Sequence, residues 1–376
     1  MCDYRTMEFV ESWGEIGAHI REARLAARLS QQRLAELIGM ERSMLTKVES
    51  GDRRVDVLEL HRLATVLDLP LGHFLSRPLT VLSRRAELRT VPADEMEPQS
   101  TSDAYRIEAL LGEWCREVQL LVEIGALTPA RQLAYPGRVD TIDAAATAAL
   151  WLRDQLGAGR DPIASMSGFA ERAGQYVLVR DIPGDGASVI DGDVAVAIVG
   201  LRGEAGRRRA TAAHELGHLI LGDEYSNDVA VNASRAEREG MVDAFAAELL
   251  LPRHVVVKVC ERLGDAELRA RLIALSATFR TSWSLALRQA CRGEVIDQRQ
   301  REKLAAAVPT RADFMAAIGW TPQPDLESVR VPPGYAQAVV AAVRAERITP
   351  VRAVELMHGE LTLEDLGETT PEVGHQ

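Results

Sequence analysis

The stretch TAAHELGHLILGDE, residues 211–224, decides how the middle of the chain is interpreted. It contains no proline, and alanine, leucine and isoleucine dominate it, so we predict a helix through it. On a helix, His214 and His218 lie one turn apart and project from one face, where both imidazoles can reach a single metal ion. Glu215 is rotated by about 100° from His214, beside the metal but outside its ligand set. This H-E-x-x-H spacing is typical of a zinc site with an adjacent general base.

A catalytic zinc usually has three protein ligands and a water, so a third ligand is expected. The segment NASRAEREGMVDAFAAELLLP (232–252) predicts a second helix, which begins near Ser234 and offers two glutamates. Glu237 fits a capping box with Ser234, whereas Glu239 shares a helical stripe with apolar residues. Because a buried unpaired carboxylate is costly and a metal ion relieves that cost, we expect Glu239 to be the third ligand. Asp243 would accept a hydrogen bond from the far nitrogen of a ligating histidine.

The spacing of these two segments is similar to that of gluzincin zinc peptidases, and together they resemble the ImmA/IrrE family of metallopeptidases. The family couples an H-E-x-x-H helix to a helix with the pattern E-x-x-x-(N/D)-x-F-A-x-x-L-L-x-P, and HELGHLILGDE followed by EREGMVDAFAAELLLP matches both. The resemblance extends over residues 140–300. It implies zinc-assisted peptide hydrolysis, in which Glu215 takes a proton from a zinc-bound water and passes it to the leaving amine.

One feature departs from that family pattern: Gly240 and Met241 stand inside the second motif, and the glycine weakens the helix beside Glu239. The alternative to a metal centre is structural. In that case Glu239 and Asp243 are a solvated carboxylate pair on a helix, and the two histidines belong to an ordinary helix.

Residues 30–54, SQQRLAELIGMERSMLTKVESGDRR, have the outline of two short helices joined by a tight turn. Ser30 is a natural N-cap, Gly39 breaks the first helix, and the second helix ends at Gly51. These residues match the pattern S-Q-x-x-L-A-x-x-I-G followed by x-x-x-x-L-x-x-x-E-x-G. By this match, residues 15–76 resemble the Xre/Cro family of DNA-binding domains.

By that resemblance, residues 41–50 form the recognition helix on double-stranded DNA. Arg42, Ser43 and Lys47 would face the major groove, where Arg42 could read guanine edges. Phosphate contacts are expected from Gln31, Arg53 and Arg54. Residues 12–76 carry nine Lys and Arg against nine Asp and Glu, so the module is not strongly basic and a homodimer on paired half-sites is favoured. In the alternative, the arginines after the second helix are solvated and the module binds proteins.

The hydrophobic period changes in the middle of the chain. YVLVR (176–180), ASVID (187–191) and VAVAIV (194–199) are short β-branched runs separated by Gly and Asp, so we predict a small sheet. The last of these strands is the one we expect to hold a substrate peptide by β-augmentation. The predicted fold class is mainly α, α+β: an all-α helix-turn-helix domain, a zincin-like domain with a small sheet and the H-E-x-x-H helix, and a helical C-terminal appendix.

The expected division of the chain is a helix-turn-helix domain at 12–76, a linker at 77–102, a connecting helix at 103–139, an ImmA/IrrE-like peptidase domain at 140–305 and a helical region at 310–376. The linker has three prolines and no sustained period. The connecting segment has apolar residues at helical spacing. We interpret the C-terminal helices as a cap that packs on the peptidase domain.

Composition excludes several classes of protein. The chain has 376 residues, a net charge of −11 and four cysteines without a C-x-x-C pair, so neither a disulfide framework nor a cysteine zinc site is indicated. The acidic N-terminus lacks the apolar core of a signal peptide, and no apolar run is long enough to span a membrane. We therefore expect a cytoplasmic protein. The negative charge argues against binding nucleic acid along the whole chain, but not against a small DNA-reading module.

Two functions remain open at this point. The first is a DNA-binding transcriptional regulator with a zinc-dependent endopeptidase domain, which hydrolyses either a Xre-type repressor in trans or the chain itself. The second is a transcription factor whose peptidase-like domain is a ligand sensor or a scaffold without proteolytic activity. The intact Glu215 favours the first, because a scaffold has no need of a general base.

Overall fold

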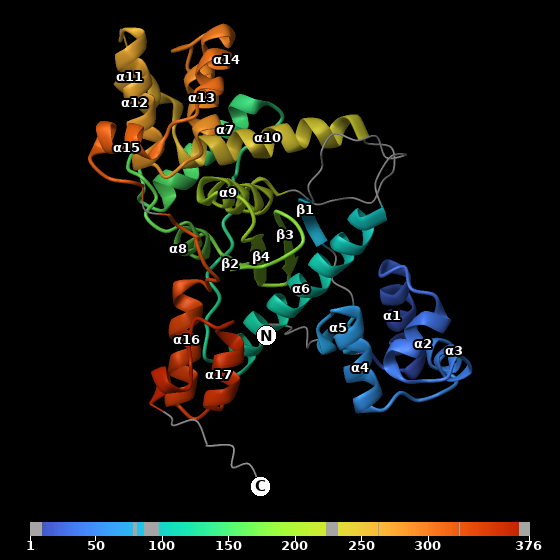
Figure 1. The fold of residues 1–376 in the computed structure, drawn as a ribbon. Helices are drawn as coiled ribbons and strands as arrows, with labels where there is room; N and C mark the ends of the chain where they lie inside the picture. The colour runs from blue at the N-terminus through green and yellow to red at the C-terminus, as the bar shows by residue number, and fades with distance from the viewer. Residues whose placement is uncertain are drawn as a thin grey trace.

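The computed structural model describes residues 10–77, 81–85, 98–222, 232–261, 263–322 and 324–367. These residues form a mainly helical structure around one small sheet (Figure 1), which confirms the predicted α+β class. No helix among them is long and apolar enough to cross a membrane.

The N-terminal domain is a cluster of five short helices: α1 (Trp13–Ala26), α2 (Gln31–Ile38), α3 (Arg42–Glu49), α4 (Val57–Leu67) and α5 (Leu71–Leu75). The side chain of Ser30 caps α2 by accepting a hydrogen bond from the backbone N–H of Arg33, as its N-cap position predicts. Gly39 ends α2 with a φ of +68°, a conformation that favours glycine, and so sets the turn into α3. The core of this domain is built from one apolar stripe of each helix, including Ile20, Leu34, Leu45, Leu63 and Phe74.

Within the described residues the sheet has four strands: β1 (Val81–Arg85), β2 (Gln175–Arg180), β3 (Gly186–Asp191) and β4 (Val194–Gly200). They lie in the order β1-β3-β4-β2, with β3 antiparallel to both of its neighbours and β2 parallel to β4. The three strands predicted from the sequence are confirmed.

The order of the strands corrects two expectations. β4 lies in the middle of the sheet, paired with β3 on one side and β2 on the other, so the prediction that this strand holds a substrate peptide is wrong. Residues 81–85 form strand β1, and α6 (Pro98–Glu123) begins before residue 103, so the irregular linker expected at 77–102 is also wrong over those parts. Residues 78–80 and 86–97 of that segment lie outside the described residues.

One face of the sheet is covered by the H-E-x-x-H helix, α9 (Ala205–Leu221), which contacts all four strands. Helices α7 (Ile142–Gln155), α8 (Met166–Arg172) and α10 (Asn232–Leu250) pack around α9, and their apolar side chains form the largest core of the molecule. The helices beyond them are α11 (Arg253–Cys260), α12 (Asp265–Thr278), α13 (Trp283–Arg292), α14 (Gln298–Ala306) and α15 (Arg311–Ile318).

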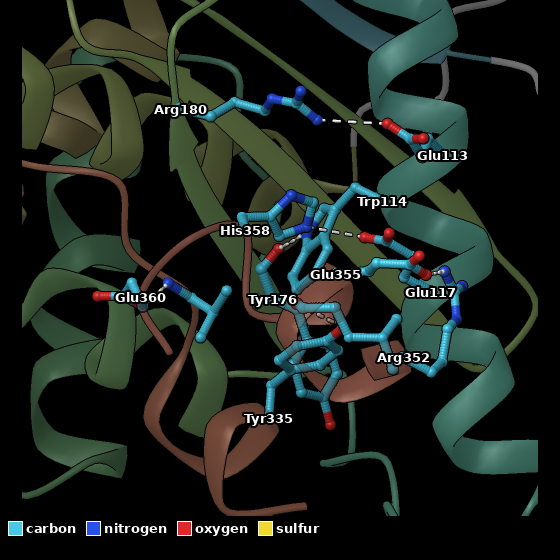
Figure 2. A network of polar contacts seen from close by, with 12 residues as sticks. Glu113, Trp114, Glu117, Tyr176, Arg180, Tyr335, Arg352, Glu355, His358 and Glu360 are labelled. Carbon is cyan, nitrogen blue, oxygen red and sulfur yellow. Dashed lines mark hydrogen bonds and ion pairs between the residues drawn. The ribbon is translucent and has the colours of Figure 1, made fainter. Parts of the chain in front are cut away.

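The other face of the sheet is covered by α6 and the C-terminal helices α16 (Pro333–Arg344) and α17 (Pro350–Leu356), with a short 3-10 helix at Glu364–Leu366. Figure 2 shows where they meet: the indole N–H of Trp114 donates to the carbonyl of Tyr176 at 2.9 Å, and the ring of Tyr335 packs edge-on against Trp114. His358 and Glu117 form a hydrogen-bonded pair of 2.8 Å beside them. The C-terminal helices therefore pack on this face of the sheet together with α6.

Helix α6 joins the two parts of the molecule, because it contributes to two cores. Its residues Ile107, Leu111 and Trp114 are buried against the sheet, whereas Tyr105 and Ala109 pack against the N-terminal domain. The position of the N-terminal domain is thus set by the same helix that covers the sheet (Figure 1).

Candidate metal centre and nucleic-acid interface

Helices α9 and α10 approach each other closely at Gly217, the glycine inside the H-E-x-x-H helix. A Cβ atom at this position would lie 2.9 Å from Val242 Cγ1 and 3.0 Å from Phe245 Cδ1, both on α10. Real Cβ atoms essentially never approach that closely, so the absence of a side chain lets α10 lie against α9. This close contact places Glu239 and Asp243 of α10 beside His214 of α9.

Helix α10 begins earlier than the sequence suggested. It starts at Asn232, so Ser234 lies inside the helix and the predicted capping box of Ser234 with Glu237 is wrong. Glu237 is exposed to solvent, which is the better reason that it takes no part in the centre. The helix runs without a break through Gly240, where an added Cβ would meet nothing within 4 Å.

Three of the predicted site residues converge. One possible ligand atom each from His214, His218 and Glu239 lies within 4.8 Å of the other two. The Nε2 atom of His214 lies 3.1 Å from Glu239 Oε2 and 3.1 Å from His218 Nε2. Ligand atoms of a tetrahedral zinc ion, at bonds of about 2.0–2.1 Å, are separated by about 3.3 Å, so this donor set fits zinc.

The centre is buried on one side and open on the other. His214 and His218 are 2% and 1% exposed, whereas the side chain of Glu239 is 36% exposed. Asp243 Oδ1 lies 2.9 Å from His214 Nδ1, the contact expected of a carboxylate that orients a ligating histidine. A proton on Nδ1, donated to Asp243, would make the lone pair of Nε2 available to a metal ion.

Glu215 lies fully buried between α9 and the sheet. Its Oε2 accepts a hydrogen bond of 2.7 Å from Ser188 Oγ on β3, and its Oε1 has no hydrogen-bond partner within the described residues. A buried carboxylate oxygen without a donor is costly, so Oε1 is the atom that a water or a substrate proton would satisfy. Sequence reasoning missed Ser188; its only signal is a hydroxyl residue in an apolar strand.

The predicted recognition helix has a clear polar face. Leu45 and Val48 of α3 are buried in the domain core, and Arg42, Ser43 and Lys47 are exposed together on the other side. Arg54, in the segment that follows, is also exposed.

The other two predicted phosphate contacts already have partners within the domain. Gln31 Nε2 donates to Glu49 Oε2 at 2.8 Å, and Arg53 donates to both carboxylate oxygens of Glu59, at 2.7 and 2.9 Å. The hydrogen bond from Arg53 holds the pKa of Glu59 below its usual value. Glu49 also pairs with buried Arg24 at 2.6 Å, an ion pair that sequence reasoning missed. Gln31 and Arg53 are therefore engaged in contacts that stabilise the domain itself.

These features define a class of protein: a helix-turn-helix regulator fold joined to a metallopeptidase-like domain. Two family models match the chain accordingly, one described as a helix-turn-helix over residues 20–74 and one described as an IrrE N-terminal-like domain over residues 171–289. The chain belongs to the helix-turn-helix family of transcriptional regulators through its N-terminal domain, and it carries an IrrE-like domain after it.

Individual proteins are similar to smaller or larger parts of the chain. An uncharacterized transcriptional regulator in the ATPase CF(0) region of Rhodospirillum rubrum is 32% identical over 74 residues, which are 20% of this chain and 67% of the relative. The restriction-modification controller protein C.AhdI from Aeromonas hydrophila is 39% identical over 16% of this chain and 94% of its own, with a TM-score of 0.16. Bacillus thuringiensis PlcR, solved with the peptide PapR7 and DNA, is 12% identical over 91% of each chain, with a TM-score of 0.17. Superpositions with scores this low say nothing about the arrangement of the present chain.

Proposed function

We propose that this protein is a DNA-binding transcriptional regulator whose IrrE-like domain is a zinc-dependent endopeptidase. The observation that supports this most directly is the convergence of His214, His218 and Glu239 beside a buried glutamate, Glu215, with one unpartnered oxygen. A donor set without a general base would suit a structural zinc site equally well. The two together suit hydrolysis.

In this proposal each side chain has a distinct role. His214, His218 and Glu239 would hold a zinc ion, which when bound would act as a Lewis acid toward the attacking water. Glu215 accepts the proton of the attacking water at Oε1 and delivers it to the leaving amine. Ser188 holds the other carboxylate oxygen in place from β3.

The N-terminal domain would direct the protein to a particular DNA sequence. Arg42, Ser43 and Lys47 of α3 would enter the major groove of an operator, and Arg54 would contact a phosphate. Because the domain carries as many acidic as basic residues, we propose that it binds as a homodimer on paired half-sites. Both activities would act in the cytoplasm.

The substrate we propose is a regulatory protein, either a Xre-type repressor in trans or this chain itself. The competing function is a sensor or scaffold, in which the IrrE-like domain binds a ligand without cutting a peptide. Either would change transcription, so the two must be separated by chemistry.

The experiment compares wild-type protein with Glu215→Gln. Both are loaded with zinc, their metal content is measured, and each is incubated with a candidate repressor while fragments are followed by mass spectrometry. We expect one zinc per chain in both, with fragments only from the wild type. If wild-type protein holds zinc and changes transcription on induction without cutting any protein, the sensor function replaces the peptidase.

A further inference from the structure

The outer edge of β3 is the part of the sheet that lies closest to the candidate general base. Two successive inward-facing residues of this strand touch the region of Glu215: Ser188 donates to its Oε2, and a Cβ built on Gly186 would lie 3.5 Å from its Oε1. The same Cβ would lie 2.7 Å from Thr211 Cγ2, so the glycine allows β3 to pack directly on α9. The position of Glu215 is thus set directly by its contacts with β3.

That edge is occupied by a segment that lies about a hundred residues earlier in the chain. β1 pairs antiparallel with β3, with Ser83 opposite Ser188, Arg84 opposite Ala187 and Arg85 opposite Gly186. The backbone of β1 therefore runs alongside the two β3 residues that adjoin Glu215, and β1 also contacts α9. An extended peptide that adds to an exposed strand makes the same pairing, since main-chain hydrogen bonds supply the affinity.

The remaining strands offer no equivalent position within the described residues. Both edges of β4 are paired, and the free side of β2 carries an isolated bridge between Val179 and Arg330. β1 ends the ladder, and it has only five residues. A short strand at the edge of a sheet is paired on one side only, so it separates from the sheet more easily than a central strand.

We infer that the outer edge of β3 is the peptide-binding edge of this site, and that β1 fills it as an intramolecular strand, which an extended segment of a protein substrate replaces. The inference rests on the proposed function in taking Glu215 as the reacting group. It names the class of substrate, an extended polypeptide antiparallel to β3, and it makes β1 the competitor that keeps the site closed.

The same arrangement links the site to the DNA-binding domain. Five residues separate Leu75, at the end of α5, from Val81, at the start of β1. An extended chain spans at most about 3.6 Å per residue, so β1 cannot move far without the N-terminal domain, nor the domain without β1. Displacement of β1 would therefore move the N-terminal domain with it.

The test removes β1 from the edge without touching the centre. In an antiparallel ladder, neighbouring residues alternate between hydrogen-bonded and non-hydrogen-bonded pairs, so one of residues 83 and 84 directs its N–H toward β3. The double variant S83P/R84P removes that donor whichever it is, and S83A/R84A is the matched control because it keeps both amides. Each pair is made in an E215Q background so that no peptide is cut.

Two measurements follow in the full-length protein: hydrogen exchange of the β3 and β4 amides, and binding of a fluorescent peptide with the sequence of residues 79–88. We expect the proline variant to exchange its β3 amides faster while β4 stays protected. Because a site that is mostly filled binds with an apparent affinity reduced by its open fraction, we expect its affinity for the peptide to rise by about tenfold or more over the control. Equal exchange and equal affinity in the two variants would overturn the inference.

A second variant guards against misfolding of the first. V81G/L82S/R84S keeps every amide of β1 and lowers its strand propensity, and it should show the same changes in smaller degree. The outcomes also separate this inference from the proposed function. A peptide that binds the opened edge but is never cut by zinc-loaded protein with Glu215 intact would sink the peptidase alone. Glu215-dependent cleavage with unchanged β3 exchange in both variants would sink the role of β1 alone.

Discussion

Ser188 Oγ donates a hydrogen bond of 2.7 Å to Glu215 Oε2, and so joins the middle of β3 to the H-E-x-x-H helix. Both residues are fully buried. Because the other oxygen of Glu215 has no partner within the described residues, this bond is what fixes the direction in which the free oxygen points. The geometry of the candidate base is therefore set from the sheet as well as from its own helix.

Substitution of Ser188 tests that relationship. In S188A the carboxylate loses its donor inside a buried site, which costs about 1–3 kcal/mol, and the base is free to rotate away from its working position. We expect peptide cleavage to fall by about tenfold or more, at unchanged zinc content. S188T keeps a hydroxyl on Cβ and should retain most of the activity. Equal rates in wild type and S188A would show that Glu215 needs no support from β3.

The metal ligands make a second prediction. H218A and E239A should each lose zinc, because a tetrahedral site that keeps only two protein ligands binds weakly. E237A is the matched control, since Glu237 lies on the same helix, two residues away, and is exposed. Zinc content after dialysis against a mild chelator is the measurement. Full occupancy in E239A, or loss of zinc in E237A, would reassign the third ligand.

Two glycines of neighbouring helices allow a direct test of how the centre is assembled. At Gly217 an added methyl group would meet Val242 and Phe245 of α10, whereas at Gly240 it would meet nothing within 4 Å. G240A should stabilise the protein by about 0.5–1 kcal/mol, the usual gain for alanine over glycine inside a helix. G217A should instead cost about 1–3 kcal/mol through overpacking, and it should weaken zinc binding by moving α10 away from α9. Urea unfolding and zinc affinity measure both effects, and a stabilised G217A with normal zinc affinity would contradict this account of the close approach.

The comparison of sequence with structure shows which features are local. Ser30, Gly39, the strands β2, β3 and β4 and the pair His214 and His218 follow from residue types within a few positions of one another, and all could be predicted. Glu239 lies in the cluster with the two histidines, but both reasons for expecting it there fail: Ser234 lies within α10 rather than at its cap, and the side chain of Glu239 is 36% exposed rather than buried.

The features that were missed depend on residues far apart in the chain. β1 pairs with a strand about a hundred residues later, and a five-residue run among prolines and charges carries no sign of that partner. The same applies to Ser188 with Glu215, and to Arg24 with Glu49. The central place of β4 could not be foreseen either, because the parallel pairing of β2 with β4 puts β3 outside them.

The recognition helix makes a prediction about DNA. R42A and K47A remove exposed side chains from α3 without touching Leu45 or Val48, so the fold should survive while specific binding weakens. A bidentate contact of Arg42 with guanine would be worth about 1–3 kcal/mol of discrimination, and loss of Lys47 would remove a second side chain from the major groove. R33A is the control, since Arg33 is exposed on α2 beside Glu36. Unchanged binding of a selected operator by the R42A/K47A double variant would mean that the domain binds proteins rather than DNA.

The contact between the N-terminal domain and α6 makes a prediction about pH. His73 Nε2 lies 2.7 Å from the hydroxyl of Tyr105, and burial, with smaller contributions from His19 and Arg116, lowers the pKa of His73 to about 4 from its usual 6.5. Above pH 6.5 this histidine is neutral in both the folded and the unfolded chain, so it does not affect stability. As the pH falls from 6.5 toward 4, His73 binds a proton in the unfolded chain but not in the folded protein. The free energy of unfolding therefore decreases.

We therefore expect wild-type protein to lose more stability between pH 7 and pH 5 than H73Q, which keeps a polar side chain but cannot titrate. Carboxylates titrate in both proteins and cancel in the comparison, so the difference belongs to residue 73. Urea unfolding at the two pH values, followed by circular dichroism, measures it. At pH 5 the exchange of amides in α1 and α5 should also rise more in wild type than in H73Q, because the charged imidazole is expelled from its place against α6. An identical loss of stability in the two proteins would show that His73 takes up its proton while docked, and that this contact does not respond to pH.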